Sequence, residues 1–89
     1  MIKSEITIIN KLGLHARAAA KLVNTASAFA SQIQLSNGQR MVDAKSIMSV
    51  MMLAASKGTT LSIEIEGHDE DRALIAITEI VNDKFGEGE

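Results

Sequence analysis

The sequence predicts an α+β domain, an open-faced β-sandwich in which three helices cover one face of a four-stranded antiparallel sheet. The apolar pattern switches between a period of two residues and a period near 3.6, in the order β-α-β-β-α-β-α. The strands alternate apolar with polar residues, which indicates a sheet with one buried face. At 89 residues, the chain has the length of a single domain, residues 1–89.

The first strand and the first helix are predicted from a change of period. Residues 2–9 alternate apolar and polar side chains, which is the pattern of a half-buried strand. Residues 16–28 instead carry apolar side chains three or four positions apart, which predicts a helix with one buried stripe. The stripe consists of Ala19, Leu22, Val23, Ala26, Phe29 and Ala30.

A hairpin and a short helix are predicted next. Asn37-Gly38 favours a hairpin turn between strands at residues 33–35 and 39–43, because both turn residues tolerate positive φ. Residues 47–54 then have the apolar spacing of a short helix. These three elements fill the middle of the chain.

The last strand and helix complete the predicted order. Residues 61–65 alternate most regularly, and the acidic run at 69–71 predicts a helix start, where the helix dipole favours carboxylates. This helix is expected to run to about Lys84 and to bury Ala73, Ile77, Ile80 and Val81. We expect the glycine- and glutamate-rich tail, residues 86–89, to fray.

The composition excludes several classes of protein. The chain has no cysteine, which excludes disulfides, zinc–thiolate sites and iron–sulfur clusters. It has no apolar run long enough to span a membrane and no signal peptide, so we expect a cytoplasmic protein. Two phenylalanines are its only aromatic residues, so an RNA-binding module is disfavoured for lack of stacking platforms. We expect a monomer without metal or cofactor.

Charge is distributed unevenly along the chain. Residues 1–57 carry seven basic and two acidic side chains, whereas residues 58–89 carry two basic and nine acidic ones. A basic surface of this kind can steer the protein onto an acidic partner. The side chains expected to steer docking are Arg17, Lys21, Arg40 and Lys45.

The start of the first predicted helix is the strongest candidate site. Gly13 allows a tight turn, and His15 follows at the N-cap position. The backbone N–H groups of Ala16, Arg17 and Ala18 lack helical partners there and can bind an anion, and the guanidinium of Arg17 can reach the same spot. A neutral imidazole within such a site can attack phosphorus. The alternative is that His15 is a plain, exposed helix-start residue.

Two sequence blocks carry a resemblance to a known family. Residues 13–17 (GLHAR), followed by alanines, resemble the active-site signature of HPr, the histidine-containing phosphocarrier proteins of the bacterial phosphotransferase system. Residues 45–48 (KSIM) resemble the regulatory serine region of that family. The resemblance extends over residues 1–85, and the fold of the family is the sandwich expected above.

The resemblance implies a phosphoryl relay. Enzyme I, charged by phosphoenolpyruvate, would pass the phosphoryl group to Nδ1 of His15, which would pass it to an enzyme IIA domain. Arg17 would lie beside the phosphate, and Ser46 would be phosphorylated by a regulatory serine kinase. The protein would thus be a phosphohistidine intermediate rather than a self-contained catalyst.

One residue departs from the family pattern. Most members have proline where this chain has Ala18. Alanine has the highest helix propensity, so the helix still forms. The departure leaves open whether the chain serves the sugar branch or the nitrogen-regulatory branch, and a binding-only regulatory paralogue is a further alternative.

The short helix at residues 47–54 is expected to have a second function, docking of partners, besides packing. Ile47, Val50 and Leu53 can supply its buried stripe, which leaves Met48 and Met51 free to bind several partners in turn. The alternative is that these methionines are core residues, which is the usual role of methionines at helical spacing. Ser46 precedes this helix as its N-cap. The residues expected to dock partners are Ala20, Lys21, Lys45, Ile47, Met48 and Met51, whereas His68 is expected to be a solvated turn residue.

Overall fold

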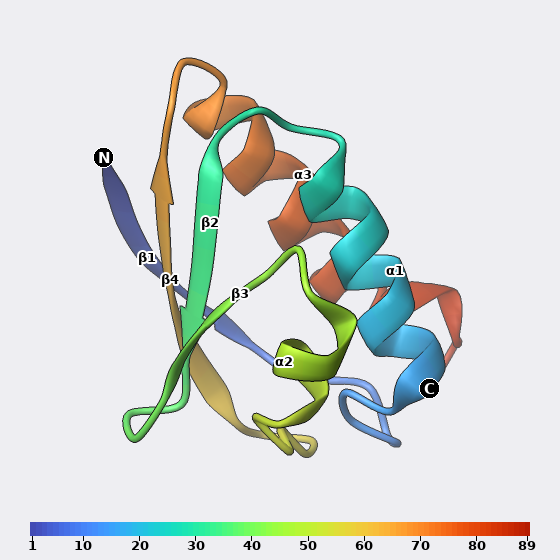
Figure 1. The fold of residues 1–89 in the computed structure, drawn as a ribbon. Coiled ribbons are helices and arrows are strands. Elements are labelled where there is room, and N and C mark those ends of the chain that lie inside the picture. Colours follow the sequence, from blue (N-terminus) through green and yellow to red (C-terminus); the bar gives the residue numbers. More distant parts are fainter.

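The computed structural model describes residues 1–89 and consists of a four-stranded antiparallel sheet with helices on one face (Figure 1). The elements are β1 (Ile2–Thr7), α1 (Ala16–Ser27), β2 (Gln32–Ser36), β3 (Met41–Asp43), α2 (Ile47–Met51), β4 (Thr60–Glu66), α3 (Glu70–Asn82) and the 3₁₀ turn η1 (Lys84–Gly86). The order and the predicted fold class are confirmed. No helix in this chain combines the length and hydropathy that crossing a bilayer requires.

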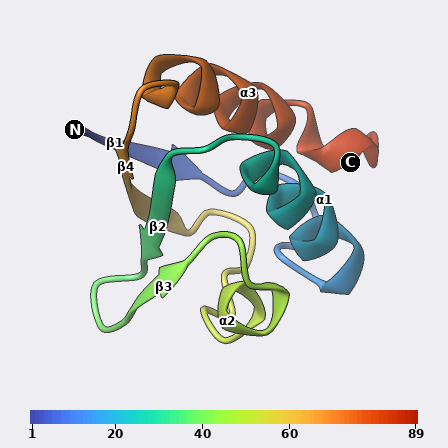
Figure 2. The ribbon, with the colours of Figure 1, turned by 45° about the horizontal axis from the view of Figure 1, so that its top comes forward.

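The strand order in the sheet is β1-β4-β2-β3, with every neighbouring pair antiparallel. Ile65 of β4 faces Ile2 on one side and Ile33 on the other, and Ile63 faces Leu35. Residues opposite one another in a sheet share a face. The apolar residues of the alternating strands therefore lie on one face of the sheet. Figure 2 shows all three helices on one side of the sheet.

The core lies between this face and the helices, and 21 apolar residues are buried in it. Helix α1 contributes Ala18, Ala19, Leu22 and Ala26, and α3 contributes Ala73, Ile77 and Val81. The core predictions for the two long helices were wrong in part. Ala30 is exposed because α1 ends at Ser27, and Val23, Phe29 and Ile80 pack only partly against the core.

The hairpin turn is wider than the sequence predicted. The predicted strand from residue 39 begins instead at Met41. The side-chain oxygen of Asn37 accepts the backbone N–H groups of Gln39 and Arg40, each at 3.0 Å. Those N–H groups are bonded within the turn, so they are not available to a strand ladder.

Helix α2 is shorter than predicted and ends at Met51 rather than at residue 54. Its last turn tightens, since the N–H of Ala54 bonds to the Met51 carbonyl at 3.1 Å. Ala54 then takes the left-handed conformation, with φ of 50°, and the chain leaves the helix direction.

The end of the chain departs most from the prediction. Helix α3 stops at Asn82, and Lys84 and Phe85 both have positive φ, 55° and 54°, which reverses the chain. Phe85 is buried after this turn. The tail expected to fray instead returns to the start of α1, where the C-terminus lies in Figure 1, and the N–H of Lys11 donates to the main-chain oxygen of Glu89 at 2.8 Å.

Candidate functional site

The segment before α1 is held rigidly against a neighbouring loop. Gly13 has φ of 70°, and a Cβ at this position would lie 2.6 Å from the carbonyl oxygen of Ala55. The N–H of the next residue, Leu14, donates to that same oxygen at 2.8 Å. Only glycine fits this close, left-handed turn, which fixes the direction in which the chain enters α1.

His15 is the N-cap residue of α1, as predicted. Its backbone is extended, with φ of −72° and ψ of 177°, and its carbonyl accepts the N–H of Ala19 at 2.8 Å. The N–H groups of Ala16, Arg17 and Ala18 have no acceptor within the chain. The first turn also contains no acidic residue, so the positive end of the α1 dipole is not offset by the helix itself.

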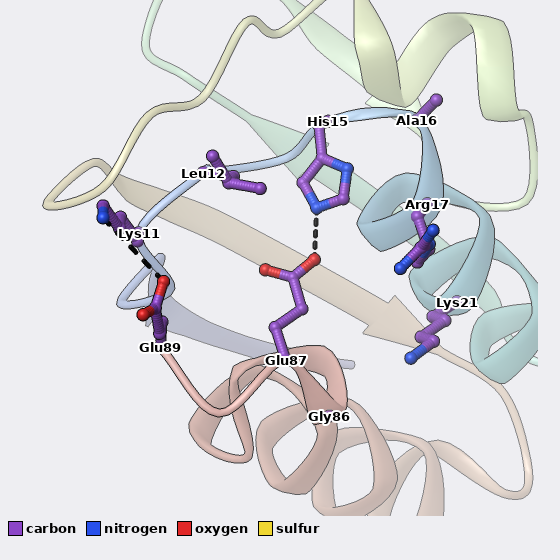
Figure 3. A pocket seen from close by; sticks show the side chains of 9 residues that line it. All are labelled: Lys11, Leu12, His15, Ala16, Arg17, Lys21, Gly86, Glu87 and Glu89. Carbon is purple, nitrogen blue, oxygen red and sulfur yellow. Dashed lines mark hydrogen bonds and ion pairs between the residues drawn. The ribbon is translucent and has the colours of Figure 1, made fainter.

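An open pocket of about 650 Å³ lies beside this helix start (Figure 3). Its lining residues are Lys11, Leu12, His15, Ala16, Arg17, Lys21, Gly86, Glu87 and Glu89. The pocket brings the predicted His15, Arg17 and Lys21 together. The lining residues from the loop and the tail were not predicted, and of these only Lys11 and Leu12, the two residues before the GLHAR block, were near a recognised signal.

The two ring nitrogens of His15 have different surroundings. Nε2 is hydrogen-bonded to Oε2 of Glu87, whereas Nδ1 lies on the side of Ala16 and Arg17 (Figure 3). The side chains of His15 and Glu87 are 30% and 13% exposed. Nδ1 is therefore the ring nitrogen without a protein partner, next to the unpaired N–H groups.

Glu87 is itself anchored in place. Its Oε1 accepts a hydrogen bond of 2.9 Å from the side-chain amide of Asn10, which is fully buried. The hydrogen bond from Asn10 and then the bond with His15 lower the pKa of the Glu87 carboxyl. The group next to His15 is consequently a carboxylate at neutral pH.

The second predicted region lies on α2, which packs beside α1. Oγ of Ser46 accepts the N–H of Ser49 at 3.4 Å, which confirms its N-cap position. Val50 is buried, whereas Met48 is 71% exposed. Further apolar side chains exposed on this helix and directly after it are Ile47, Met51 and Met52. The expectation that Ile47 joins the buried stripe was therefore wrong.

Two of the four cations expected to steer docking lie away from the pocket. Nζ of Lys45 donates to the carbonyl of Phe29 at 2.7 Å, beyond the C-terminal end of α1. At 1.5 Å per residue, that end is about 18 Å from His15 along the helix axis. Arg40 is exposed in the hairpin turn and does not line the pocket. The cationic side chains at the site are those of Lys11, Arg17 and Lys21.

The remaining histidine does not form a site. His68 is exposed in the turn between β4 and α3, as predicted. The structure contains no group of three or more His, Asp or Glu side chains with the spacing to hold a metal ion. His15 is thus the histidine with a functional environment.

Comparisons with known proteins show the family of this chain. The family model "PTS HPr component phosphorylation site" matches residues 2–83. The phosphocarrier protein HPr of Pseudomonas aeruginosa is 58% identical over 86 residues, or 96% of each chain, and that of Cupriavidus necator is 54% identical over the full length of both. The crystal structure of HPr-C-His from Thermoanaerobacter tengcongensis matches with a TM-score of 0.93 and 46% identity, covering 98% of each chain. The chain belongs to the HPr family of phosphocarrier proteins of the phosphotransferase system.

Proposed function

We propose that Nδ1 of His15 accepts a phosphoryl group from phosphorylated enzyme I and passes it to an enzyme IIA domain. The observation that carries this proposal is the asymmetry of the ring. Nε2 is bound to Glu87, and Nδ1 lies next to the unpaired N–H groups at the start of α1. A nucleophilic nitrogen within an anion site is the arrangement that phosphoryl transfer requires.

The transfer step follows from this arrangement. The lone pair of Nδ1 attacks phosphorus, the bond between phosphorus and the donor atom of enzyme I breaks, and its electron pair returns to the donor. The phosphoryl oxygens then face the N–H groups of Ala16, Arg17 and Ala18 and the guanidinium of Arg17. In transfer to enzyme IIA, a nucleophile of that domain attacks phosphorus, the bond between phosphorus and Nδ1 breaks, and its electron pair returns to Nδ1. The protein is therefore a relay intermediate rather than a self-contained enzyme.

The partners are proposed to dock on the surface formed by α1 and α2. Met48 and Met51 are exposed there, and Ala20 is half-exposed on α1. Flexible methionine side chains can adapt to more than one partner, and enzyme I and enzyme IIA must use the same histidine in turn. The protein would act as a cytoplasmic monomer that exchanges partners.

Labelling with enzyme I and labelled phosphoenolpyruvate tests the proposal. The wild-type protein should become labelled, and the label should be acid-labile and alkali-stable, as expected of a phosphoramidate. His15→Ala should abolish the label with little change in melting temperature, because the side chain is outside the core. His68→Ala is the matched control and should be labelled normally. A label that persists in His15→Ala would contradict the assignment, and an unlabelled wild-type protein would favour a binding-only paralogue.

We further propose that phosphorylation of Ser46 regulates docking. Ser46 precedes the exposed Ile47 and Met48, so a phosphoryl group would add a charge of about −1.5 to −2 at the docking surface. Ser46→Asp should raise the apparent KM for transfer from enzyme I by about tenfold or more, because the negative charge must be desolvated at the interface. The melting temperature should not fall, since Asp also caps helices. Equal rates for Ser46→Asp and Ser46→Ala would contradict this mechanism.

A further inference from the structure

The C-terminal tail contributes a side chain to the phosphate-accepting site through a chain of three hydrogen-bonded residues. The side-chain amide of the buried Asn10 donates to Gly13 at 2.8 Å and to Oε1 of Glu87 at 2.9 Å. Oε2 of Glu87 binds Nε2 of His15. Asn10 thus links the turn at Gly13, which sets the direction of α1, to the carboxylate that contacts the reactive ring.

Several independent contacts hold the tail in this place. Phe85 is 1% exposed and anchors it to the core. Nζ of Lys21 donates to the Phe85 carbonyl at 2.6 Å, and the N–H of Lys11 donates to the main-chain oxygen of Glu89. The position of Glu87 therefore follows from packing and hydrogen bonding on both sides of it.

The contact matters because the charge of the ring changes during transfer. A neutral imidazole with its hydrogen on Nε2 has its lone pair on Nδ1. When Nδ1 binds phosphorus and Nε2 keeps its hydrogen, the ring gains a positive charge. A carboxylate on Nε2–H is more favourable after this change than before it, which is the differential stabilisation that assists a reaction. The same logic applies to the carboxylate behind the histidine of a catalytic triad.

We propose that Glu87, held by Asn10, is a positioning residue for phosphoryl transfer. Its carboxylate binds Nε2–H, turns Nδ1 toward the start of α1 and balances the positive charge that the ring gains. This inference rests on the proposed function of His15. It assigns a role to a residue of the tail, which lies outside the GLHAR and KSIM blocks.

The test compares Glu87→Gln with Glu89→Gln. Both variants remove one charge from the same pocket, but Glu89 pairs with the exposed Lys11 at 3.9 Å and does not contact His15. The transfer rate from enzyme I at saturating carrier should fall about tenfold in Glu87→Gln, with KM within twofold of the wild type, because the hydrogen-bond acceptor at Nε2 loses the negative charge that balances the ring. Glu89→Gln should change neither quantity by more than about twofold.

An NMR titration of the phosphorylated proteins separates this role from a structural one. In Glu87→Gln, Nε2 of the phosphorylated ring should lose its proton at a pH about one unit lower than in the wild type. The other charged side chains that line the pocket, Lys11, Arg17, Lys21 and Glu89, are retained in this variant. If the wild-type protein is phosphorylated on His15 and the two variants behave alike in rate and titration, the role of Glu87 is wrong while the proposed function stands. If His15 of the wild type is never phosphorylated, both fall.

Discussion

Two carboxylates from the acidic last third of the chain lie near opposite ends of α1, and their surroundings differ. Asp69 lies beyond the C-terminal end, where it accepts the N–H groups of Ala30 at 2.8 Å and Ser31 at 3.0 Å and is also bonded to the Ser31 hydroxyl. Glu87 lies at the N-terminal end, on the ring of His15. Asp69 is bound by donors that never change charge, whereas Glu87 is bound by a group that changes charge when it reacts.

This difference separates a structural carboxylate from one that can take part in chemistry. The hydrogen bond from Ser31, followed by the backbone bonds, lowers the pKa of Asp69 to about 2. Its contribution is therefore constant at neutral pH and belongs to the stability of the fold. Glu87 lies instead in an open pocket beside three cations, where its interaction energy depends on the state of His15. Basic and acidic parts of the sequence thus meet in one site and do not form two separate surfaces.

Stability provides the largest expected contrast. Asp69→Asn removes the charge that several donors share and turns an amide toward buried N–H groups, so the melting temperature should fall by about 10 °C. Glu87→Gln should lower it by no more than about 2 °C, because that side chain borders an open pocket. Thermal unfolding followed by circular dichroism measures both. Equal losses of melting temperature in the two variants would contradict the distinction between a structural carboxylate at Asp69 and a site carboxylate at Glu87.

Acid pH should produce a smaller effect at the Asp69 end. The pKa of Asp69 is depressed in the fold relative to the ordinary 3.8, so its stabilisation is complete above about pH 5 and is lost as pH falls toward 2. The melting temperature of the wild type should therefore decline over this range more steeply than that of Asp69→Asn. The pKa of Glu87 is lowered as well, so the tail should also be released as the pH falls. Parallel curves for wild type and Asp69→Asn would contradict the role of Asp69.

Local patterns were sufficient to predict the fold and the centre of the site. The alternation at residues 61–65 marks the strand that both neighbours pair with, and the helix start at His15 is defined by residues next to it in sequence. Each of these features depends on side chains within a few positions of one another, and such features can be read without knowing the tertiary structure.

The tail could not be predicted, for a physical reason. Glu87 lies 72 positions from His15, and its approach depends on positive φ at Lys84 and Phe85, residues that rarely adopt it. A sequence of alternating glycine and glutamate has the composition of a frayed end, and the burial of Phe85 together with the hydrogen bonds from Lys11 and Lys21 reverses that expectation. The contact of Lys45 could not be predicted for a related reason, since its acceptor is a backbone carbonyl, which leaves no trace in the sequence.

The smallest expected effect concerns two lysines that each donate to a backbone carbonyl, one from within α1 to the tail and the other to the loop beyond the C-terminal end of α1. Nζ of Lys21 donates to the Phe85 carbonyl at 2.6 Å, and Nζ of Lys45 donates to the Phe29 carbonyl at 2.7 Å. Lys21→Met should loosen the tail and accelerate amide exchange at Lys11, whose N–H bonds to Glu89, by roughly three- to tenfold. The melting temperature should hardly change, because local opening of the tail leaves the core intact.

Lys45→Met is the matched control for this experiment. It should leave exchange at Lys11 unchanged and instead accelerate exchange at Ala30 and Ser31, whose N–H groups bind Asp69 next to the Phe29 carbonyl. The two variants should therefore affect opposite ends of the same helix. Exchange that increases at both ends in either variant would mean that α1 transmits the disturbance along its length, and the tail would then not open independently of the loop that Asp69 holds.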